Sequence, residues 1–497
     1  MAALLAACLL TVSCATSGSA TSSKAVEPVD DAYRNYYEVF VWSFYDTDND
    51  GIGDLNGVTE KLGYIKDLGF NGIWLMPITA GTSYHMYDVE NYYDVDPRYG
   101  TLDDMRNLVE KAHGMGIDII IDLVVNHTSS SHPWFRSACE YLVAHGEPGG
   151  EYGDYYSFSQ TQKQGYQRVP GSAWYYECQF TGTMPDLNLD SPKVRDEIEN
   201  IMKFWLQDIG VDGFRLDAVT SFYTNSTQKS IEFLSFLDTA AKALKSDCYI
   251  VGEAWLTNNK AVREYYSSGI DSFFCFPLAT GTGKIADTLK DIRSNPGEYF
   301  GNLMEELEEV YDTGILAPFL SNHDTARIAS FTGRSQTDKI KMSQGLLSLM
   351  SGSLFVYYGE EIGMISTSDG SDPYKRIAMK WSDKNENQTN NNESSEEESV
   401  FITYLLTTVK TNLKEIERLI EEAAINWRIE RIALIERNIL RMSVAELIDE
   451  NNGVPFKATI NEAIDIAKKF GSKESSSFVN GIINKVADII DIKNKKL

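Results

Sequence analysis

Short apolar runs alternate with amphipathic stretches along most of the chain, from about residue 38 to residue 358. The amphipathic stretches carry apolar residues at helical spacing, so the pattern predicts strands joined by helical crossovers. Eight such runs predict an α/β fold, a (β/α)8 TIM barrel around a parallel sheet. The expected strands are Glu38–Trp42, Gly72–Leu75, Ile117–Val125, Gly213–Leu216, Tyr249–Val251, Ser272–Phe276, Ile315–Leu320 and Leu354–Tyr358.

Residues 128–190 interrupt this alternation directly after the third strand. They are rich in Tyr, Gly, Ser and Gln, and they are too long for an ordinary loop in a compact fold. Aromatic side chains such as Trp134 and Trp174 can bury substantial area, which favours a folded inserted subdomain over a disordered insert. We expect residues 25–127 and 191–382 to form the first and second parts of the barrel.

The character of the sequence changes again after Trp381. Residues 383–399 are polar and acidic with almost no apolar side chains, which predicts a disordered linker. Residues 400–497 carry apolar residues at helical spacing and predict a separate all-α domain. Its helices are expected over Phe401–Ala423, Asn426–Ile448, Thr459–Phe470 and Ser475–Ile490, with a capping box formed by Thr459 and Glu462.

Charge is distributed unevenly between the two parts. The whole chain has a formal net charge of −27, whereas residues 399–497 carry 15 Lys and Arg against 14 Asp and Glu, a net charge of +1. The remaining residues therefore carry −28, which argues against nucleic acid as the partner of the larger part. Such a balance suits a solvated enzyme that acts on a neutral ligand.

The N-terminal segment, residues 1–24, combines the apolar run Met1–Val12 with Cys14 and a tether rich in Ser, Thr and Ala. It resembles a bacterial lipoprotein signal, so we expect export and a lipid anchor at the cell envelope. If the signal does not function, the chain stays in the cytoplasm. Cys139 and Cys178 fall in the predicted insert, where they either form a disulfide outside the cytoplasm or remain free thiols.

Charged and imidazole side chains follow four of the apolar runs. Arg215 and Asp217 lie on the same side of their strand, and a guanidinium so close favours the ionised carboxylate. An ordinary ion pair at a strand end has the same pattern. Three further runs lead into His127, Glu253 and the segment Asn322–Asp324. This recurrence predicts a functional site at the carboxyl edge of the parallel sheet.

Asp217, Glu253 and Asp324 supply three carboxylates at the ends of three strands. Cleavage of a glycosidic bond uses such a set: a nucleophile, a proton donor with a raised pKa and a group that stabilises an oxocarbenium-like transition state. His127 and His323 stand beside these motifs and are suited to hydrogen-bond sugar hydroxyls. The residue types therefore point to a glycosidase.

The loop from Asp46 to Asp54 places carboxylates at alternate positions among glycines. A hard cation such as Ca²⁺ takes oxygen ligands in this arrangement, and without a cation the carboxylates repel one another. A solvated acidic loop is the alternative. An EF-hand is disfavoured, because the loop follows a strand and has no glutamate at the twelfth position.

Four motifs resemble the signature regions of the α-amylase family of glycoside hydrolases, in the same order and at suitable separations. They are Asp122–His127, Gly213–Asp217, Val251–Trp255 and Phe319–Asp324. The resemblance covers about residues 37–381 and ends before the last helix of the barrel, so it implies a truncated barrel. We expect such a barrel to expose apolar strand surface.

The resemblance implies retaining endo-hydrolysis of α-1,4-glucosidic bonds in starch and maltooligosaccharides, with a separation of about 5 Å between nucleophile and acid. In the family pattern Asp217 is the nucleophile, Glu253 the acid and base, and Asp324 the transition-state stabiliser. Ala218 resembles members that cleave α-1,4 bonds, while Met184–Asn188 is typical of a group intermediate between α-amylases, neopullulanases and oligoglucosidases. The family's remaining contacts match Tyr87, His127, Arg215 and His323 in the substrate site, and Asp46, Asp48, Asp50, Ile52 and Asp54 around Ca²⁺.

The helical tail, over about residues 400–494, resembles the NusB transcription antitermination factors. The resemblance rests on Asn426–Trp427, Glu436–Arg441, Ile460–Ala463 and Phe478–Gly481. The family's arginine-rich first helices are missing, so little attraction for RNA is expected. We interpret the chain as a fusion of two truncated genes rather than an evolved bifunctional protein. Two other hypotheses are an RNA-binding antitermination factor and an inactive remnant that only binds glucan.

Overall fold

The computed structural model describes most of the chain in two compact units, Met1–Asn391 and Asn392–Leu497. The boundary between the units falls within the predicted linker. The predicted signal and tether lie outside the described residues. Described are residues 34–279, 285, 301–305, 307, 314–332, 337–366, 372–381, 387–389, 412–424, 428, 429, 432, 434–448, 456–470 and 475–494.

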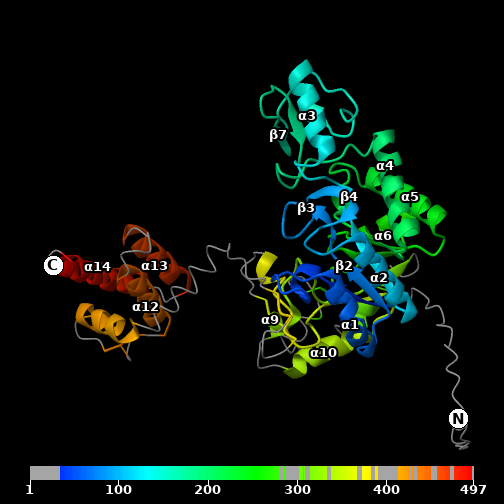
Figure 1. Cartoon of the computed structure of the whole chain (residues 1–497). Helices are drawn as coiled ribbons and strands as arrows, with labels where there is room; N and C mark the ends of the chain where they lie inside the picture. The colour runs from blue at the N-terminus through cyan, green and yellow to red at the C-terminus, as the bar shows by residue number, and fades with distance from the viewer. Residues whose placement is uncertain are drawn as a thin grey trace, which may run out of the picture. The chain divides into compact units, whose positions relative to one another are not determined.

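Eight parallel strands form the centre of the first unit, in the order β12-β11-β10-β9-β5-β2-β1-β13 (Figure 1). A parallel bridge between Phe319 and Phe355 links the two ends of the sheet, so the predicted barrel is nearly closed. The strands are β1 (Asn35–Val39), β2 (Gly72–Leu75), β5 (Asp118–Leu123), β9 (Gly213–Leu216), β10 (Tyr249–Gly252), β11 (Ser272–Phe274), β12 (Ile315–Ala317) and β13 (Leu354–Tyr357).

Aromatic side chains fill the inside of the barrel. Tyr36 stacks on Tyr249 and on Phe355, with ring centroids 5.2 and 4.8 Å apart. Trp74 packs beside them and is fully buried. The barrel is therefore a packed core, which holds the ends of the strands in fixed positions.

The first strand begins earlier than predicted, because β1 spans Asn35–Val39 rather than Glu38–Trp42. Val41 and Trp42 belong to a 3-10 turn, η2 (Val41–Ser43), in which Val41 is buried. The apolar run continues past the strand because this turn also packs into the core. Hydrophobicity alone could not locate the end of the strand. The other predicted strands overlap the observed ones. Where the predicted run is long, the observed strand ends before the run does.

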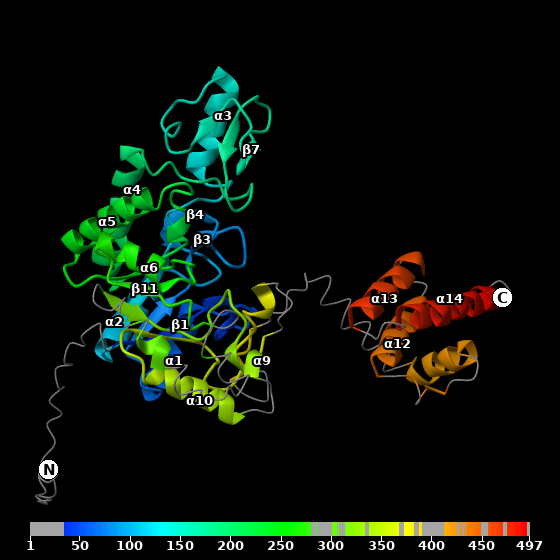
Figure 2. The ribbon, with the colours of Figure 1, turned by 180° about the vertical axis from the view of Figure 1, so that it is seen from behind.

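Helices pack around the barrel between the strands (Figures 1 and 2). Several of them begin at a capping residue. The Asp54 carboxylate accepts the Gly57 N–H at 2.7 Å at the start of α1, and Thr101 with Asp104 forms a capping box at the start of α2. The helices are α1 (Leu55–Asp67), α2 (Leu102–Gly114), α4 (Pro192–Lys203), α5 (Thr227–Leu244), α6 (Asn259–Tyr265), α9 (Ile328–Thr332) and α10 (Thr337–Ser348). Shorter turns are the π-helical η3 (Phe204–Ile209) and the 3-10 turns η4 (Val219–Ser221), η5 (Tyr266–Ser268) and η6 (Asp372–Tyr374).

A small subdomain stands out from the barrel between β5 and α4 (Figure 1). The ring of Phe135 lies edge-on to Tyr156 and Tyr176, with centroids 5.0 and 4.8 Å apart. This aromatic core makes the segment a folded part of the chain. It contains α3 (Pro133–His145) and an antiparallel sheet of β6 (Phe158–Ser159), β8 (Tyr175–Glu177) and β7 (Tyr166–Arg168), while β3 (Thr79–Gly81) and β4 (Val89–Val95) form a separate hairpin earlier in the chain.

Among the residues that the structure describes, the cysteines form no disulfide. Cys139 and Cys178, the pair that the sequence left open, form no disulfide in the structure, and Cys248 and Cys275 are buried thiols. Within the described residues, no helix combines the length and the apolar character that a membrane crossing requires.

In the part that the structure describes, the end of the barrel does not expose the apolar strand surface that the sequence predicts. Val356 and Tyr357 in β13 are buried. The hydroxyls of Tyr37 and Tyr64 both donate to Glu361 Oε1 at 2.7 Å, which holds the segment after β13 against β1 and α1. The exposed large apolar side chains of this region lie instead on α10 and in neighbouring loops, namely Met342, Leu349 and Ile362.

The second unit is helical, as predicted. Residues 412–423 form a helix, followed by α12 (Leu434–Ile448), α13 (Phe456–Phe470) and α14 (Ser475–Asn494). The three later helices pack on one another around Leu440, Val444, Ile483 and Val486. The predicted capping box is wrong, because α13 begins at Phe456 and Thr459 is buried inside the helix. The predicted helix residues 401–411 lie outside the described residues.

Candidate active site

The predicted site residues of the barrel gather at the carboxyl ends of the strands. Arg215 lies in β9, with Asp217 directly after the strand. Glu253 follows β10, and His323 with Asp324 follows β12. Parallel strands bring these ends to one edge of the barrel, where their side chains meet.

Arg215 contacts the carboxylates that come from three strands. Its Nη1 donates to Asp217 Oδ1 at 2.7 Å and to Asp122 Oδ1 at 2.9 Å. Its Nη2 lies 2.7 Å from Glu253 Oε1, an ion pair without the alignment of a hydrogen bond. Arg215 is fully buried, so this guanidinium fixes the relative positions of three acidic groups in a water-poor environment.

Glu253 is placed where its protonated form is favoured. Burial, together with the charges of Asp217 and Asp324, outweighs the opposing charge of Arg215 and raises the pKa of Glu253 to about 8. The backbone N–H of Ala218 donates to Glu253 Oε2 at 3.2 Å. Ala218 has a left-handed backbone with φ of 47°, so the turn after Asp217 aims this N–H at the carboxyl group.

Asp324 has the opposite electrostatic environment. Its Oδ2 lies 3.0 Å from His323 Nε2, and its Oδ1 lies 2.7 Å from Arg376 Nη2. Burial opposes ionisation, but the His323 charge, the His323 hydrogen bond and the Arg376 charge together hold the pKa of Asp324 below its ordinary value. The site therefore combines a protonated carboxyl and an ionised carboxylate at neutral pH.

His323 is held between acidic groups and an aromatic ring. Its Nδ1 lies 2.7 Å from Glu38 Oε1 in β1, and its Nε2 lies 2.7 Å from the Tyr87 hydroxyl. Burial lowers the pKa of His323, but Asp324 and Glu38 outweigh it and raise that pKa to about 9. Tyr87 also donates to Asp122 Oδ2 at 3.1 Å, which connects this group to Arg215.

His127 has a buried ring nitrogen without a hydrogen-bond partner, Nε2. Its Nδ1 lies 3.3 Å from the Asn126 side-chain amide, and burial lowers the pKa of His127. A buried imidazole nitrogen needs a partner, and a substrate hydroxyl can supply one.

Two exposed aromatic rings lie next to these groups. Trp255 is 48% exposed and stacks flat on Phe276, with ring centroids 4.6 Å apart, two residues after Glu253. Phe180 is 51% exposed and comes from the inserted subdomain, with its ring 5.3 Å from that of His127. Exposed rings on rigid supports are suited to pack against the apolar faces of sugars.

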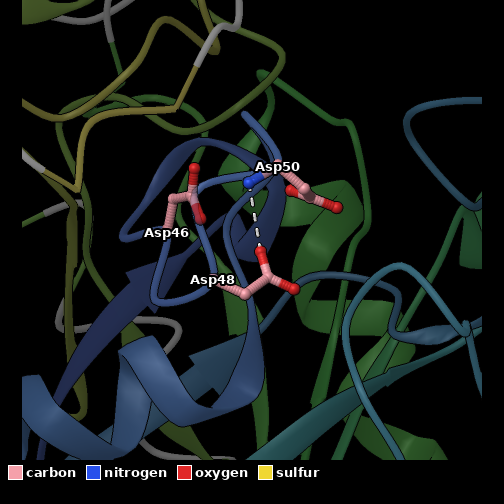
Figure 3. Close-up of side chains that lie close together, drawn as sticks. All are labelled: Asp46, Asp48 and Asp50. Carbon is pink, nitrogen blue, oxygen red and sulfur yellow. Dashed lines mark hydrogen bonds between the residues drawn. The ribbon is translucent and has the colours of Figure 1, made fainter.

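The acidic loop brings three of its predicted ligands together (Figure 3). Carboxylate oxygens of Asp46, Asp48 and Asp50 lie within 4.8 Å of one another. Asp46 is buried, and its two oxygens accept the N–H groups of Asn49 and Gly51. Oxygens at these separations can contact one Ca²⁺ ion, so the residues present fit this cation.

Asp54, another predicted calcium ligand, is not part of that cluster. Asp54 uses its carboxylate to accept the N–H groups of Thr47 and Gly57, both at 2.7 Å, as the cap of α1. The Ile52 N–H donates to Asp50 Oδ1 at 2.7 Å. Asn387, from the predicted linker, donates through its side chain to the Asp46 carbonyl at 2.8 Å. The acidic loop is thus held by α1, which follows it in the chain, and by Asn387, which comes after the barrel.

Three site residues were not identified from the sequence: Glu38, Asp122 and Arg376. Asp122 pairs in register with Arg215 across β5 and β9. Glu38 and Asp122 interrupt apolar runs, and a charged residue inside a predicted barrel strand was the signal that could have found them. Arg376 lies beyond β13 and carries no such signal.

Comparison with known proteins finds a matching family model for each part of the chain. The family model described as "Alpha amylase, catalytic domain" matches residues 38–421, and that of the NusB family matches residues 368–488. Alpha-amylase 3 of Dictyoglomus thermophilum is 43% identical over 361 residues, 71% of this chain and 68% of the relative. An oligo-1,6-glucosidase of Heyndrickxia coagulans is 30% identical over 400 residues, 69% of each chain.

Solved structures give the same assignment for the barrel. Eubacterium rectale Amy13B superposes with a TM-score of 0.70 and 44% identity, covering 74% of each chain. The α-amylase from H. orenii superposes with a TM-score of 0.61 and 37% identity, covering 71% of this chain and 73% of that structure.

Proposed function

This chain belongs to the α-amylase family of glycoside hydrolases, with a NusB-family region at its C-terminal end, and we propose that it hydrolyses internal α-1,4-glucosidic bonds in starch and maltooligosaccharides with retention of configuration. We assign Asp217 as the nucleophile, Glu253 as the acid and base, and Asp324 as the transition-state stabiliser. The observation that carries the proposal is the shared contact of Asp217 and Glu253 with Arg215, at 2.7 Å each.

The first chemical step uses the unequal protonation of these groups. Glu253, whose pKa is about 8, gives its proton to the departing glycosidic oxygen while Asp217 attacks the anomeric carbon. The C–O bond to the leaving sugar breaks, and an ester bond forms to Asp217. Asp324 is held ionised and faces the positive charge that develops on the sugar ring.

The second step reverses the role of Glu253. The Asp217 charge is one of the contributions that raise the pKa of Glu253. Once Asp217 is esterified this contribution disappears, so the pKa of Glu253 falls. The ionised Glu253 then takes a proton from water, whose oxygen attacks the anomeric carbon and releases Asp217.

Three aromatic and imidazole groups are assigned to the sugar before the cleaved bond. Tyr87 packs nearly parallel to His323, with ring centroids 5.6 Å apart and an angle of 18° between the planes. His323 is positioned by Glu38 for a hydroxyl contact, and the unpartnered Nε2 of His127 accepts or donates another. These contacts suit a neutral sugar in a site that excludes water.

Two exposed aromatic rings, one beside the acid and one beside His127, support endo action. Trp255 follows the group that protonates the leaving oxygen, so it can pack against the leaving sugars. Phe180 adjoins His127 and can pack against sugars on the other side. Ala218 after the nucleophile favours α-1,4 linkages by resemblance, whereas the names of relatives include both α-amylase and oligo-1,6-glucosidase.

We also propose that Ca²⁺ binds at Asp46, Asp48 and Asp50, whose carboxylate oxygens lie close together. The family resemblance adds the Ile52 carbonyl and Asp54 to this proposed ligand set. The ion neutralises carboxylates that otherwise repel one another, and it supplies rigidity rather than catalysis. Export with lipid attachment remains a proposal that rests on residues 1–24. The net charge of +1 on residues 399–497 offers little attraction for phosphate, so we do not assign RNA binding to the tail.

The test is the release of reducing ends from soluble starch by the full chain and by Asp217→Asn. We expect rapid formation of mixed oligosaccharides by the native chain and none by the variant, with the α-anomer as the first product by NMR. Release of a single small product only would contradict endo action. Binding of maltooligosaccharide without hydrolysis by the folded native chain would favour the inactive remnant.

A further inference from the structure

Arg376 reaches the active site from outside the barrel strands. It lies beyond β13, shortly after η6 ends at Tyr374, and is 2% exposed. Its Nη2 lies 2.7 Å from Asp324 Oδ1, its Nε donates to the His323 carbonyl at 3.1 Å, and its Nη1 donates to the Tyr84 hydroxyl at 3.2 Å. The guanidinium therefore contacts both the side chain of Asp324 and the backbone that carries it.

The segment around Arg376 is fixed from several sides. Ser43 Oγ donates to the Arg376 carbonyl at 2.6 Å, and the Tyr358 hydroxyl donates to the Ile377 carbonyl at 2.6 Å. Lys375 Nζ donates to the Asp324 carbonyl at 2.9 Å. A guanidinium mounted on so many contacts can hold a partner in one orientation at little further entropic cost.

The two oxygens of Asp324 are held by two different cations. His323 Nε2 lies next to Oδ2, and Arg376 Nη2 lies next to Oδ1. With both contacts present the carboxylate cannot rotate without losing an ion pair. With only one, it can turn about its last torsion, and its charge then no longer lies at a fixed place for the transition state.

We propose that Arg376 is a positioning residue, which holds Asp324 in the orientation that stabilises the transition state. This inference deepens the proposed hydrolase function and rests on it. The rival explanation is that Arg376 only stabilises the fold by tying down the segment after β13. The charged and titratable groups facing Asp324 include His323, Arg376, Arg215, Glu253, His85 and Tyr87, with Asp372 beyond Arg376.

The experiment compares Arg376→Gln and Arg376→Lys with Tyr358→Phe in the full chain. Tyr358→Phe removes one anchor of the same segment without touching Asp324. For Arg376→Gln we expect kcat to fall about 10- to 100-fold, the loss typical of a hydrogen bond to a charged group, with KM within about threefold of the native value. Arg376→Lys should recover part of kcat, and guanidinium ion at tens of millimolar should rescue Arg376→Gln better than urea at the same concentration.

Several results would overturn the proposal. One is a native kcat in Arg376→Gln. Another is that Tyr358→Phe loses as much kcat and as much melting temperature as Arg376→Gln, while guanidinium does not rescue Arg376→Gln. A crystal structure of Arg376→Gln tests the positioning role without a kinetic measurement. An unchanged Asp324 side chain would contradict that role, and a rotated Asp324 side chain would support it. Native chain and Asp217→Asn run alongside, so failure of the hydrolase function itself would be recognised as inactivity of the native chain.

Discussion

Replacing Glu253 by glutamine changes catalysis and stability in opposite directions. The two side chains have nearly the same shape, and the glutamine oxygen can still accept the Ala218 N–H that lies 3.2 Å from Glu253 Oε2. The substitution removes the proton that the leaving sugar needs. General acid catalysis contributes about 10²- to 10⁴-fold, so kcat on maltooligosaccharides should fall by that factor, a loss of about 3–5 kcal/mol.

The same substitution should stabilise the fold at neutral pH. Burial raises the pKa of Glu253 from 4.5 to about 8. A carboxyl group whose pKa is higher in the folded state costs stability as the pH rises through this window, because the unfolded chain releases the proton first. At pH 7 the cost is about 3 kcal/mol, and at pH 5 it is less than about 1 kcal/mol. Glutamine carries no proton to release and removes this cost.

Urea unfolding of the native chain and Glu253→Gln at pH 5 and pH 7 measures the difference. Trp427 is the only tryptophan after residue 391, so tryptophan fluorescence reports mainly on the barrel. The variant should be more stable at pH 7 by about 3 kcal/mol and nearly equal at pH 5. The same difference at both pH values would refute the raised pKa, and native kcat in the variant would refute the acid role.

Three further outcomes follow from the site. Because Glu253 must be protonated in the free enzyme, kcat/KM should decline tenfold per pH unit above about pH 8, and a plateau extending to pH 10 would contradict its pKa. Chelation of Ca²⁺ should lower the melting temperature of the native chain, whereas Asp48→Asn with Asp50→Asn should be insensitive to chelator; an unchanged native melting temperature would exclude the cation. Trp255→Ala should raise KM for maltooligosaccharides about 3- to 10-fold while Trp255→Phe keeps most of the affinity, and equal effects of the two would argue against stacking.

The residues that follow strand ends could be predicted because two simple patterns coincide there. Apolar runs mark the buried strands, and Asp217, Glu253 and Asp324 each stand where such a run gives way to polar residues. A parallel barrel brings these ends together whatever the exact lengths of the helices between them. The clustering of the three carboxylates therefore needed no knowledge of the helices or of the inserted subdomain.

The residues inside strands could not be predicted in the same way. Asp122 meets Arg215 because β5 and β9 pair in a register that places them side by side, and register is set by the whole barrel. The apolar pattern places Glu38 first in a strand that in fact begins at Asn35, so it does not predict the contact of Glu38 with His323. Both contacts depend on which side of the sheet a charged residue faces. That side can be predicted only when the first and last residues of the strand are known.

The position of Arg376 also shows that the proposed active site is complete within the barrel. Every residue to which we assign a catalytic or positioning role lies between Glu38 and Arg376. The segment that carries Arg376 continues to Trp381, whose indole N–H donates to the Phe44 carbonyl at 2.5 Å and whose ring packs edge-on to Tyr64 at 5.0 Å. These contacts attach the segment to the loop after β1 and to α1, so it supports the site from the first strand and first helix of the barrel. The proposed chemistry is therefore complete before the predicted linker begins and requires no residue of the helical unit.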